Sequence, residues 1–150
     1  MFQDSNAESL PELQNIESKE LLGFFEDILN ADLNLRVRVT GRSMVPFLKG
    51  NELLTIKKVP RTLLHSGDLI FYKTNDGFPI LHRIVRKKFN GKKYLIHTKG
   101  DSLLTIDEPV TEDRIIGKVC RIEKAGINGE IKDINMESYL QQTLNYASAV

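Results

Sequence analysis

The stretch LRVRVTGRSMVPFLKGNELLTIKKV, Leu35 to Val59, decides the fold class of this chain. Its first part, LRVRVT, alternates aliphatic residues with arginines, and this period of two is typical of a half-buried strand. Its last part, ELLTIKKV, is rich in aliphatic residues and Thr and predicts a second strand. Between the two lies Gly41-x-Ser43-Met44-x-Pro46, a tight segment that carries a serine. The stretch therefore predicts β structure on both sides of Ser43.

The chain beyond this stretch has the same strand-like character. Further runs rich in Ile, Val, Tyr and Phe are separated by Gly, Pro, Asn and Asp, which favour turns. These runs are DLIFYK (68–73), ILHRIVRKKF (80–89), KKYLIHTK (92–99) and RIIGKVCRIEK (114–124). Asn90-Gly91 predicts a type I′ hairpin turn, and GINGE at 126–130 predicts a second tight connection. We therefore predict a mainly β domain.

Helices are expected only near the two ends. Leu22, Phe25 and Ile28 recur at helical spacing in SKELLGFFEDILNA, which predicts an amphipathic helix over residues 18 to 30. The end of the chain, DINMESYLQQTLNYASAV, predicts a short C-terminal helix. With 150 residues, 41% of them hydrophobic, the chain is long enough for one core. We divide it into residues 1–34, a tail and helix packed on the domain, and residues 35–150, the β domain with its C-terminal tail.

Composition narrows the classes of partner. The 21 Lys and Arg residues nearly balance the 20 Asp and Glu residues, so no overall positive field predicts a nucleic-acid partner. The N-terminus is acidic and polar, unlike a secretory signal, and no apolar run approaches the ~20 residues of a membrane-spanning helix. The single Cys120 excludes an internal disulfide and a cysteine-based zinc site. We expect a soluble cytoplasmic protein without an integral membrane segment, and leave open a peripheral place at the membrane.

A histidine could activate the serine of the first stretch. A serine nucleophile needs a base within hydrogen-bond reach and donors for the developing oxyanion. The chain has three histidines, His65, His82 and His97. Strand alternation places His82 on the same face as Ile80 and Ile84, where a neutral imidazole could accept a proton. The same position also suits a partly buried structural histidine, and this interpretation stays open.

Carboxylates that could orient a histidine occur in the segment HTKGDSLLTIDEPV. Asp101 follows a glycine, and Asp107 comes six residues later. An aspartate beside a catalytic histidine holds the imidazole in position and stabilises its protonated form. Aspartates next to Gly and Pro are also common in turns. No pair of histidines has the spacing of an HExxH zinc motif, so we predict neither a metal site nor a cofactor.

The order of these motifs resembles the type I signal peptidase superfamily. The resemblance covers about residues 35 to 122 and rests on an ordered series whose members are individually weak. The series is Gly41-x-Ser43-Met44-x-Pro46, SGDLIFYK (66–73), LHRIV (81–85), TKGD (98–101) with Asp107, and IIGKV (115–119). The resemblance implies a β fold like that of signal peptidases and LexA, with an N-terminal amphipathic helix and a short C-terminal helix added.

The resemblance also implies roles for individual residues. Bacterial signal peptidases and LexA-like autoproteases have a lysine base where this chain has His82, whereas the endoplasmic-reticulum and archaeal branch has a histidine. By this resemblance Ser43 is the nucleophile and His82 the base. Asp107 is the orienting acid, and Asp101 supports the site from beside it.

Two places depart from the signal peptidase pattern: Gly50-Asn51, where relatives usually have Gly-Asp, and Gly41. Gly41 stands where signal peptidases commonly carry a serine whose hydroxyl helps to bind the oxyanion. The backbone amides of Arg42 and Ser43 are then the expected oxyanion donors, as in the LexA-like arrangement. Loss of one donor can slow a serine enzyme by ~10²-fold or more.

The resemblance implies a serine endopeptidase that cleaves a peptide or protein precursor through an acyl-enzyme. Its substrate would lie as an extended strand along a sheet edge. One alternative is a catalytically inactive peptide-binding module of the same fold. A weaker alternative is a LexA-like self-cleaving regulator, because the N-terminal region offers little beyond one helix and the chain lacks an upstream Ala-Gly or Cys-Gly cleavage site.

Overall fold

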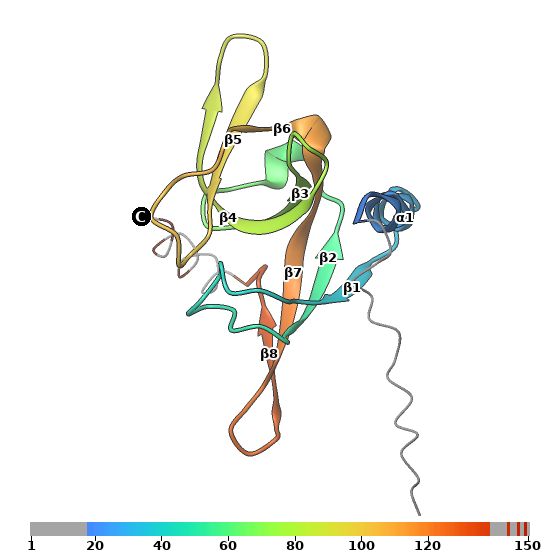
Figure 1. The fold of residues 1–150 in the computed structure, drawn as a ribbon, viewed down its shortest axis with the longest axis vertical. Helices are drawn as coiled ribbons and strands as arrows, with labels where there is room; N and C mark the ends of the chain where they lie inside the picture. The colour runs from blue at the N-terminus through green and yellow to red at the C-terminus, as the bar shows by residue number, and fades with distance from the viewer. Residues whose placement is uncertain (1–17, 139–143, 145–146, 148, 150) are drawn as a thin grey trace, which may run out of the picture.

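An antiparallel β-sheet forms the body of the protein (Figure 1). The computed structural model describes residues 18–138 together with residues 144, 147 and 149. Within these residues the sheet contains eight strands in the order β1-β2-β7-β3-β4-β5-β6, with β8 also paired to β7. The strands are β1 (Leu35–Arg38), β2 (Leu53–Lys57), β3 (Leu69–Lys73), β4 (Pro79–Phe89), β5 (Tyr94–Lys99), β6 (Val110–Thr111), β7 (Ile115–Ala125) and β8 (Ile131–Asn135). The predicted mainly β class is confirmed.

Strand β7 connects the parts of the sheet, because different stretches of it pair with β2, β3 and β8. Its residue Gly117 lies where the packing leaves no space for a side chain. An added Cβ would lie 2.6 Å from Ile56 Cγ2 and 3.3 Å from Leu29 Cδ1. The glycine therefore allows β2 and the N-terminal helix to approach β7 closely.

The two hairpins agree with the sequence in position but not fully in detail. The predicted type I′ turn at Asn90-Gly91 is wrong, because Gly91 has a φ of 91° but Asn90 does not have a positive φ. Four residues connect β4 to β5, and the Asn90 side chain closes this turn by accepting hydrogen bonds from the amides of Lys92 and Lys93. The second connection is tight as predicted: the Gly126 amide donates to the Glu130 carbonyl over 2.6 Å. Neither β8 nor the two-residue β6 was predicted.

The N-terminal helix α1 (Ser18–Asn30) spans the predicted residues. Leu22 and Leu29 are buried in the same hydrophobic cluster as residues of β1, β2 and β7. An ion pair of 2.7 Å between Glu26 Oε1 and Lys73 Nζ also ties the helix to β3. The apolar face of α1 thus completes one side of the core, as expected of an amphipathic surface helix.

The short C-terminal helix that we predicted falls mostly outside the described residues. Residues 144, 147 and 149 have helical backbone, and their neighbours are not described. None of the helices in the described part of the chain has the length and apolar content needed to cross a bilayer.

Candidate active site

Ser43 lies in a loop that leaves the sheet after β1 and returns to it at β2. Two backbone hydrogen bonds close the base of this loop, from the Val39 amide to the Glu52 carbonyl (2.9 Å) and from the Asn51 amide to the Val39 carbonyl (2.8 Å). The side chains of Met44 and Leu48 are buried in the hydrophobic core and anchor the loop to it. Ser43 itself is half-buried, so its hydroxyl is held by a loop with a packed base.

Two glycines with positive φ lie at the neck of the serine loop. Gly41 has a φ of 93° and Gly50 a φ of 98°, a region that L-residues with side chains rarely occupy. A Cβ built on Gly50 would lie 3.5 Å from the Gly41 carbonyl oxygen. The Gly41 that departs from the signal peptidase pattern therefore has a conformational role at the neck of the loop.

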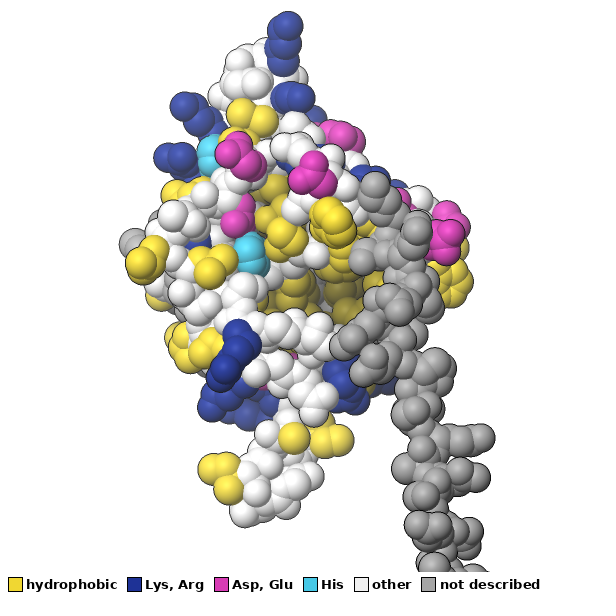
Figure 2. Space-filling view, in the orientation of Figure 1, with side chains coloured by type: hydrophobic (Ala, Val, Ile, Leu, Met, Phe, Trp, Pro, Cys, Tyr) yellow, Lys and Arg dark blue, Asp and Glu magenta, His cyan; other side chains and the backbone are white. Residues whose placement is uncertain are grey.

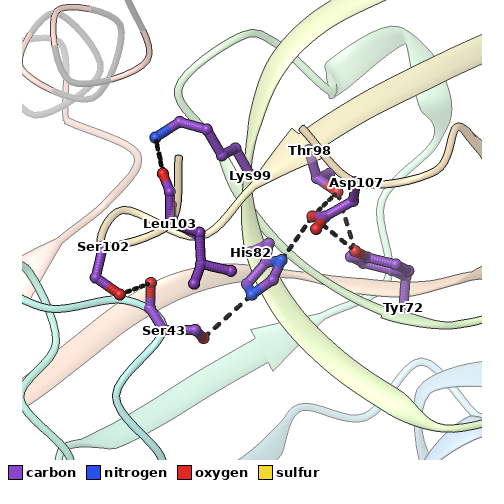
Figure 3. A network of polar contacts seen from close by, with 9 residues as sticks. Ser43, Tyr72, His82, Thr98, Lys99, Ser102, Leu103 and Asp107 are labelled. Atoms are coloured by element: carbon purple, nitrogen blue, oxygen red, sulfur yellow. Dashed lines mark hydrogen bonds and ion pairs between the residues drawn. The ribbon is translucent and has the colours of Figure 1, made fainter. Parts of the chain in front are cut away.

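His82 projects from β4 toward the serine. The residue is only 5% exposed, and its Nε2 lies 3.1 Å from Ser43 Oγ. Strand β4 is paired on both sides, with β3 and with β5, and Ile70 of β3 stands opposite His82. The imidazole is thus fixed by a strand inside the sheet and faces the hydroxyl of a separate loop (Figure 3).

Asp107 is the carboxylate that meets His82. Its Oδ2 lies 2.6 Å from His82 Nδ1. In the tautomer with its proton on Nδ1, the imidazole donates to the Asp107 carboxylate and presents the Nε2 lone pair to Ser43. Figure 3 shows the serine and the aspartate on opposite sides of the imidazole ring. The structure therefore brings together three residues that lie far apart in the sequence.

Asp101 does not contact His82, because it pairs with the next residue of β4. Arg83 Nε donates to Asp101 Oδ1 over 2.8 Å, and Arg83 Nη2 donates to Asp101 Oδ2 over 2.7 Å. The arginine is 1% exposed, donates also to the Gly67 carbonyl, and has its guanidinium 4.7 Å from the centre of the Phe47 ring. This bidentate pair attaches the segment after β5 to the strand that carries His82.

Ser102, which was not predicted as a site residue, holds the backbone of Ser43. Its amide donates to the Ser43 carbonyl over 3.0 Å. Its Oγ lies 3.0 Å from the carbonyl oxygens of both Arg42 and Ser43 and can donate its one proton to either. Gly100 makes this approach possible, because a Cβ there would lie 2.7 Å from the Ser43 carbonyl oxygen and 3.0 Å from His82 Nε2.

The predicted oxyanion donors are the amides of Arg42 and Ser43. Among the described residues neither amide donates a hydrogen bond to another protein group. Their carbonyls, in contrast, are engaged by Ser102, and the Arg42 carbonyl also accepts from the Val45 amide over 3.1 Å. The loop thus fixes its carbonyls and leaves these two amides uncommitted.

The other two histidines lie apart from this cluster. His65 is in the turn before β3, and its Nδ1 is 4.0 Å from Asp68 Oδ2. His97 is in β5, where partial burial, Arg86 and Lys88 lower its pKa. In the described residues no three His, Cys, Asp or Glu side chains come together as metal ligands would.

The molecular surface is hollowed on the face seen in Figure 2, and the floor of the hollow is apolar. An open cavity of about 430 Å³ adjoins the segment after Ser43 and is lined by Pro46, Phe47, Asp101 and Lys124. Lys124 donates to the Phe47 carbonyl, and its ammonium lies 4.5 Å from the centre of the Phe47 ring. Burial lowers the pKa of Lys124, although Glu52 opposes this effect.

Comparison of the chain with protein-family models, with curated proteins and with solved structures gives no match in any of the three. The function therefore has to be argued from the arrangement of the chain's own residues.

Proposed function

We propose that this protein is a serine endopeptidase of the signal peptidase type. The observation that carries the proposal is the continuous chain from Ser43 Oγ to His82 Nε2 (3.1 Å) and from His82 Nδ1 to Asp107 Oδ2 (2.6 Å). Both distances are within hydrogen-bond range. The two ring nitrogens of His82 contact the serine and the aspartate in the arrangement that general-base catalysis requires.

The proposed reaction has two stages. In the first, Ser43 Oγ attacks the carbonyl carbon of the peptide bond while His82 Nε2 accepts the hydroxyl proton. The resulting oxyanion accepts hydrogen bonds from the amides of Arg42 and Ser43. When the C–N bond breaks, His82 returns the proton to the leaving amine, and the acyl group remains on Ser43. In the second stage His82 activates a water that hydrolyses this ester and regenerates the serine.

Asp107 stays ionised in this mechanism and stabilises the imidazolium that forms on His82. Asp101 supports the site indirectly, because its pair with Arg83 fixes the segment that carries Gly100 and Ser102. Ser102 in turn holds the Ser43 carbonyl, and Gly100 leaves the space for this approach. A peptide bound as an extended strand is the proposed substrate, since main-chain hydrogen bonds could hold it beside Ser43.

The inactive binding module remains the alternative against which this proposal is tested. No contact in the described residues favours it, since the Ser43 hydroxyl lies within hydrogen-bond distance of the base. A LexA-like regulator that cuts itself would need a cleavage segment, and the sequence lacks the upstream Ala-Gly or Cys-Gly of that family.

The test uses purified protein and a fluorophosphonate probe, which labels a serine only where a base activates it. Wild type is expected to label at Ser43, whereas Ser43→Ala should not label and His82→Ala should label at least about 10³-fold more slowly. Ser66→Ala is the matched control, because Ser66 lies in the turn before β3 and donates to the Val85 carbonyl. Mass spectrometry of peptide ends in cells that make wild type or Ser43→Ala would then identify substrates.

Equal labelling and equal peptide cleavage by wild type and Ser43→Ala would reject the proposal that this protein is a serine endopeptidase. A folded wild type that binds peptides but neither labels nor cleaves would support the binding module instead.

A further inference from the structure

The aspartate of the proposed triad lies outside the strands. Asp107 follows β5 in the connection to β6, and its side chain is 22% exposed. A carboxylate on such a segment can rotate about its side-chain bonds unless other groups hold it. The hydrogen bond from His82 holds only one carboxylate oxygen of Asp107, and from a single direction. The position of Asp107 therefore depends on further contacts, which the sequence did not reveal.

Two hydroxyl groups converge on the same carboxylate oxygen that accepts from His82. Thr98 Oγ1 lies 2.8 Å from Asp107 Oδ2, and the Tyr72 hydroxyl lies 3.1 Å from it. The two hydroxyls are themselves 3.0 Å apart. The Asp107 amide also donates to the Thr98 carbonyl over 2.9 Å, so Thr98 contacts this aspartate through both its backbone and its side chain.

The two hydroxyl groups come from rigid parts of the fold. Tyr72 lies in β3, which is paired with both β4 and β7, and the residue is 2% exposed. Thr98 lies in β5 opposite Ile84 and is fully buried. Burial, and to a smaller extent Asp107, raise the pKa of Tyr72 to about 12. The phenol therefore keeps its proton and remains a donor at any pH at which a peptidase would work.

We propose that Tyr72 and Thr98 are positioning residues that hold Asp107 Oδ2 against His82 Nδ1 and so keep Nε2 available to Ser43. This inference rests on the proposed peptidase function and adds two residues to its machinery. The hydroxyls supply a donor direction that the imidazole alone cannot. They also share the negative charge of the carboxylate.

Either hydroxyl can donate to Asp107 when the other is absent. Thr98 has one hydroxyl proton and can donate it either to Asp107 or to the Tyr72 oxygen. If Tyr72 is removed, Thr98 still donates to the carboxylate, and if Thr98 is removed, Tyr72 does. Each single variant therefore leaves one donor, and only the double variant leaves the carboxylate without hydroxyl support.

Loss of both hydroxyls has a second consequence that a purely structural role would not have. A carboxylate that no longer shares its charge holds the imidazolium form of His82 more firmly. The acid limb of the pH profile should therefore move to higher pH. Among the charged groups outside this cluster, Arg114 acts electrostatically on Tyr72, and Arg83, the neighbour of His82 in β4, is paired with Asp101. Neither is altered in the variants below.

The experiment compares Tyr72→Phe, Thr98→Val and the double variant, all in the full chain. The readouts are the rate of fluorophosphonate labelling as a function of pH and the ¹H NMR signal of His82 Nδ1–H, identified by its loss in His82→Ala. Each single variant should label less than about 10-fold more slowly, because one hydroxyl donor remains, and the double variant about 100-fold more slowly, at the upper end of the range usual for removal of an outer hydrogen-bond partner of a functional histidine. Tyr94→Phe, a tyrosine in β5 outside the network, is the control.

Thr98→Ser distinguishes positioning from packing, because it keeps the hydroxyl and removes only the methyl group. Near wild-type labelling by Thr98→Ser would support positioning, and a loss as large as that of Thr98→Val would overturn it. Wild-type labelling by the double variant, or slow labelling with an unmoved acid limb and an intact Nδ1–H signal, would also overturn it. If wild type does not label, loss of the Nδ1–H signal in the double variant still supports positioning while the peptidase proposal fails.

Discussion

Gly100 is the residue at which a single methyl group should disturb both stability and catalysis. It follows β5 directly, next to the Arg83–Asp101 pair, and its own backbone turns toward the serine loop. A Cβ at this position would lie 2.7 Å from the Ser43 carbonyl oxygen, 2.9 Å from Leu103 Cδ1 and 3.0 Å from His82 Nε2. The Leu103 side chain can rotate away. The serine carbonyl is backbone and is held by Ser102, so it has little freedom to yield.

The size of the effect follows from these distances. Favourable contacts of carbon atoms lie at about 3.5 Å, so Gly100→Ala must push the serine loop away by roughly 0.5 Å or more. Overpacking of this kind costs about 1–3 kcal/mol of unfolding free energy. Because a displacement of about 1 Å can cost about 10²-fold in rate, roughly half of it should slow labelling of Ser43 about tenfold.

The assay pairs urea unfolding with the rate of fluorophosphonate labelling. Gly23→Ala is the matched control, since Gly23 lies within α1 and a Cβ there would meet nothing within 4 Å. That control should label like wild type and gain up to about 1 kcal/mol from helix propensity. If Gly100→Ala has the stability and labelling rate of wild type, the tight approach between this glycine, Ser43 and His82 does not exist in solution.

Three further predictions concern the supports of the site. Arg83→Met should lower the free energy of unfolding by about 3–5 kcal/mol in a urea titration, because it leaves the mostly buried Asp101 carboxylate unpaired. Arg121→Met breaks an exposed ion pair and should stay close to wild type in the same assay. Leu29→Ala should cost about 3–5 kcal/mol through the cavity left between α1 and β7, measured by thermal unfolding. Tyr72 is protonated below its unfolded pKa of 10.0 in both states, and only the unfolded state loses the proton as pH rises toward the folded pKa of about 12. Stability should therefore fall by about 3 kcal/mol across this window, and Tyr72→Phe should lack that part of the fall in urea titrations at pH 9 and 11.5.

Much of the fold follows from local pattern. Period-two alternation and turn residues predicted the strands that became β1 to β5 and β7, and helical spacing predicted α1 over Ser18–Asn30. The pattern failed for β6 and β8. Strand β6 has two residues, too few for a period, and β8 is largely exposed, so neither face of it is marked by apolar side chains.

Arg83 shows where alternation misleads. The sequence places it next to His82 on a strand, where an arginine would ordinarily face water. In the structure it is 1% exposed, because Asp101 neutralises it and the Phe47 ring packs against it. Both partners are distant in sequence, and neither contact leaves a local signal. Tyr72 and Thr98 are similar cases, since a strand tyrosine and a strand threonine give no sign that their hydroxyls meet a carboxylate.

The sequence by itself determined which groups are available: a serine in a glycine-flanked loop, a histidine on a strand, and two aspartates six residues apart. Only the tertiary structure decided between those aspartates. The pairing of Arg83 with Lys99 puts Gly100 beside His82, so Asp101 meets Arg83, and the connection then folds back until the Asp107 amide reaches the Thr98 carbonyl. Strand register and the return path of a loop are long-range properties. They arise from packing across the sheet, and for that reason the residue pattern around either aspartate does not contain them.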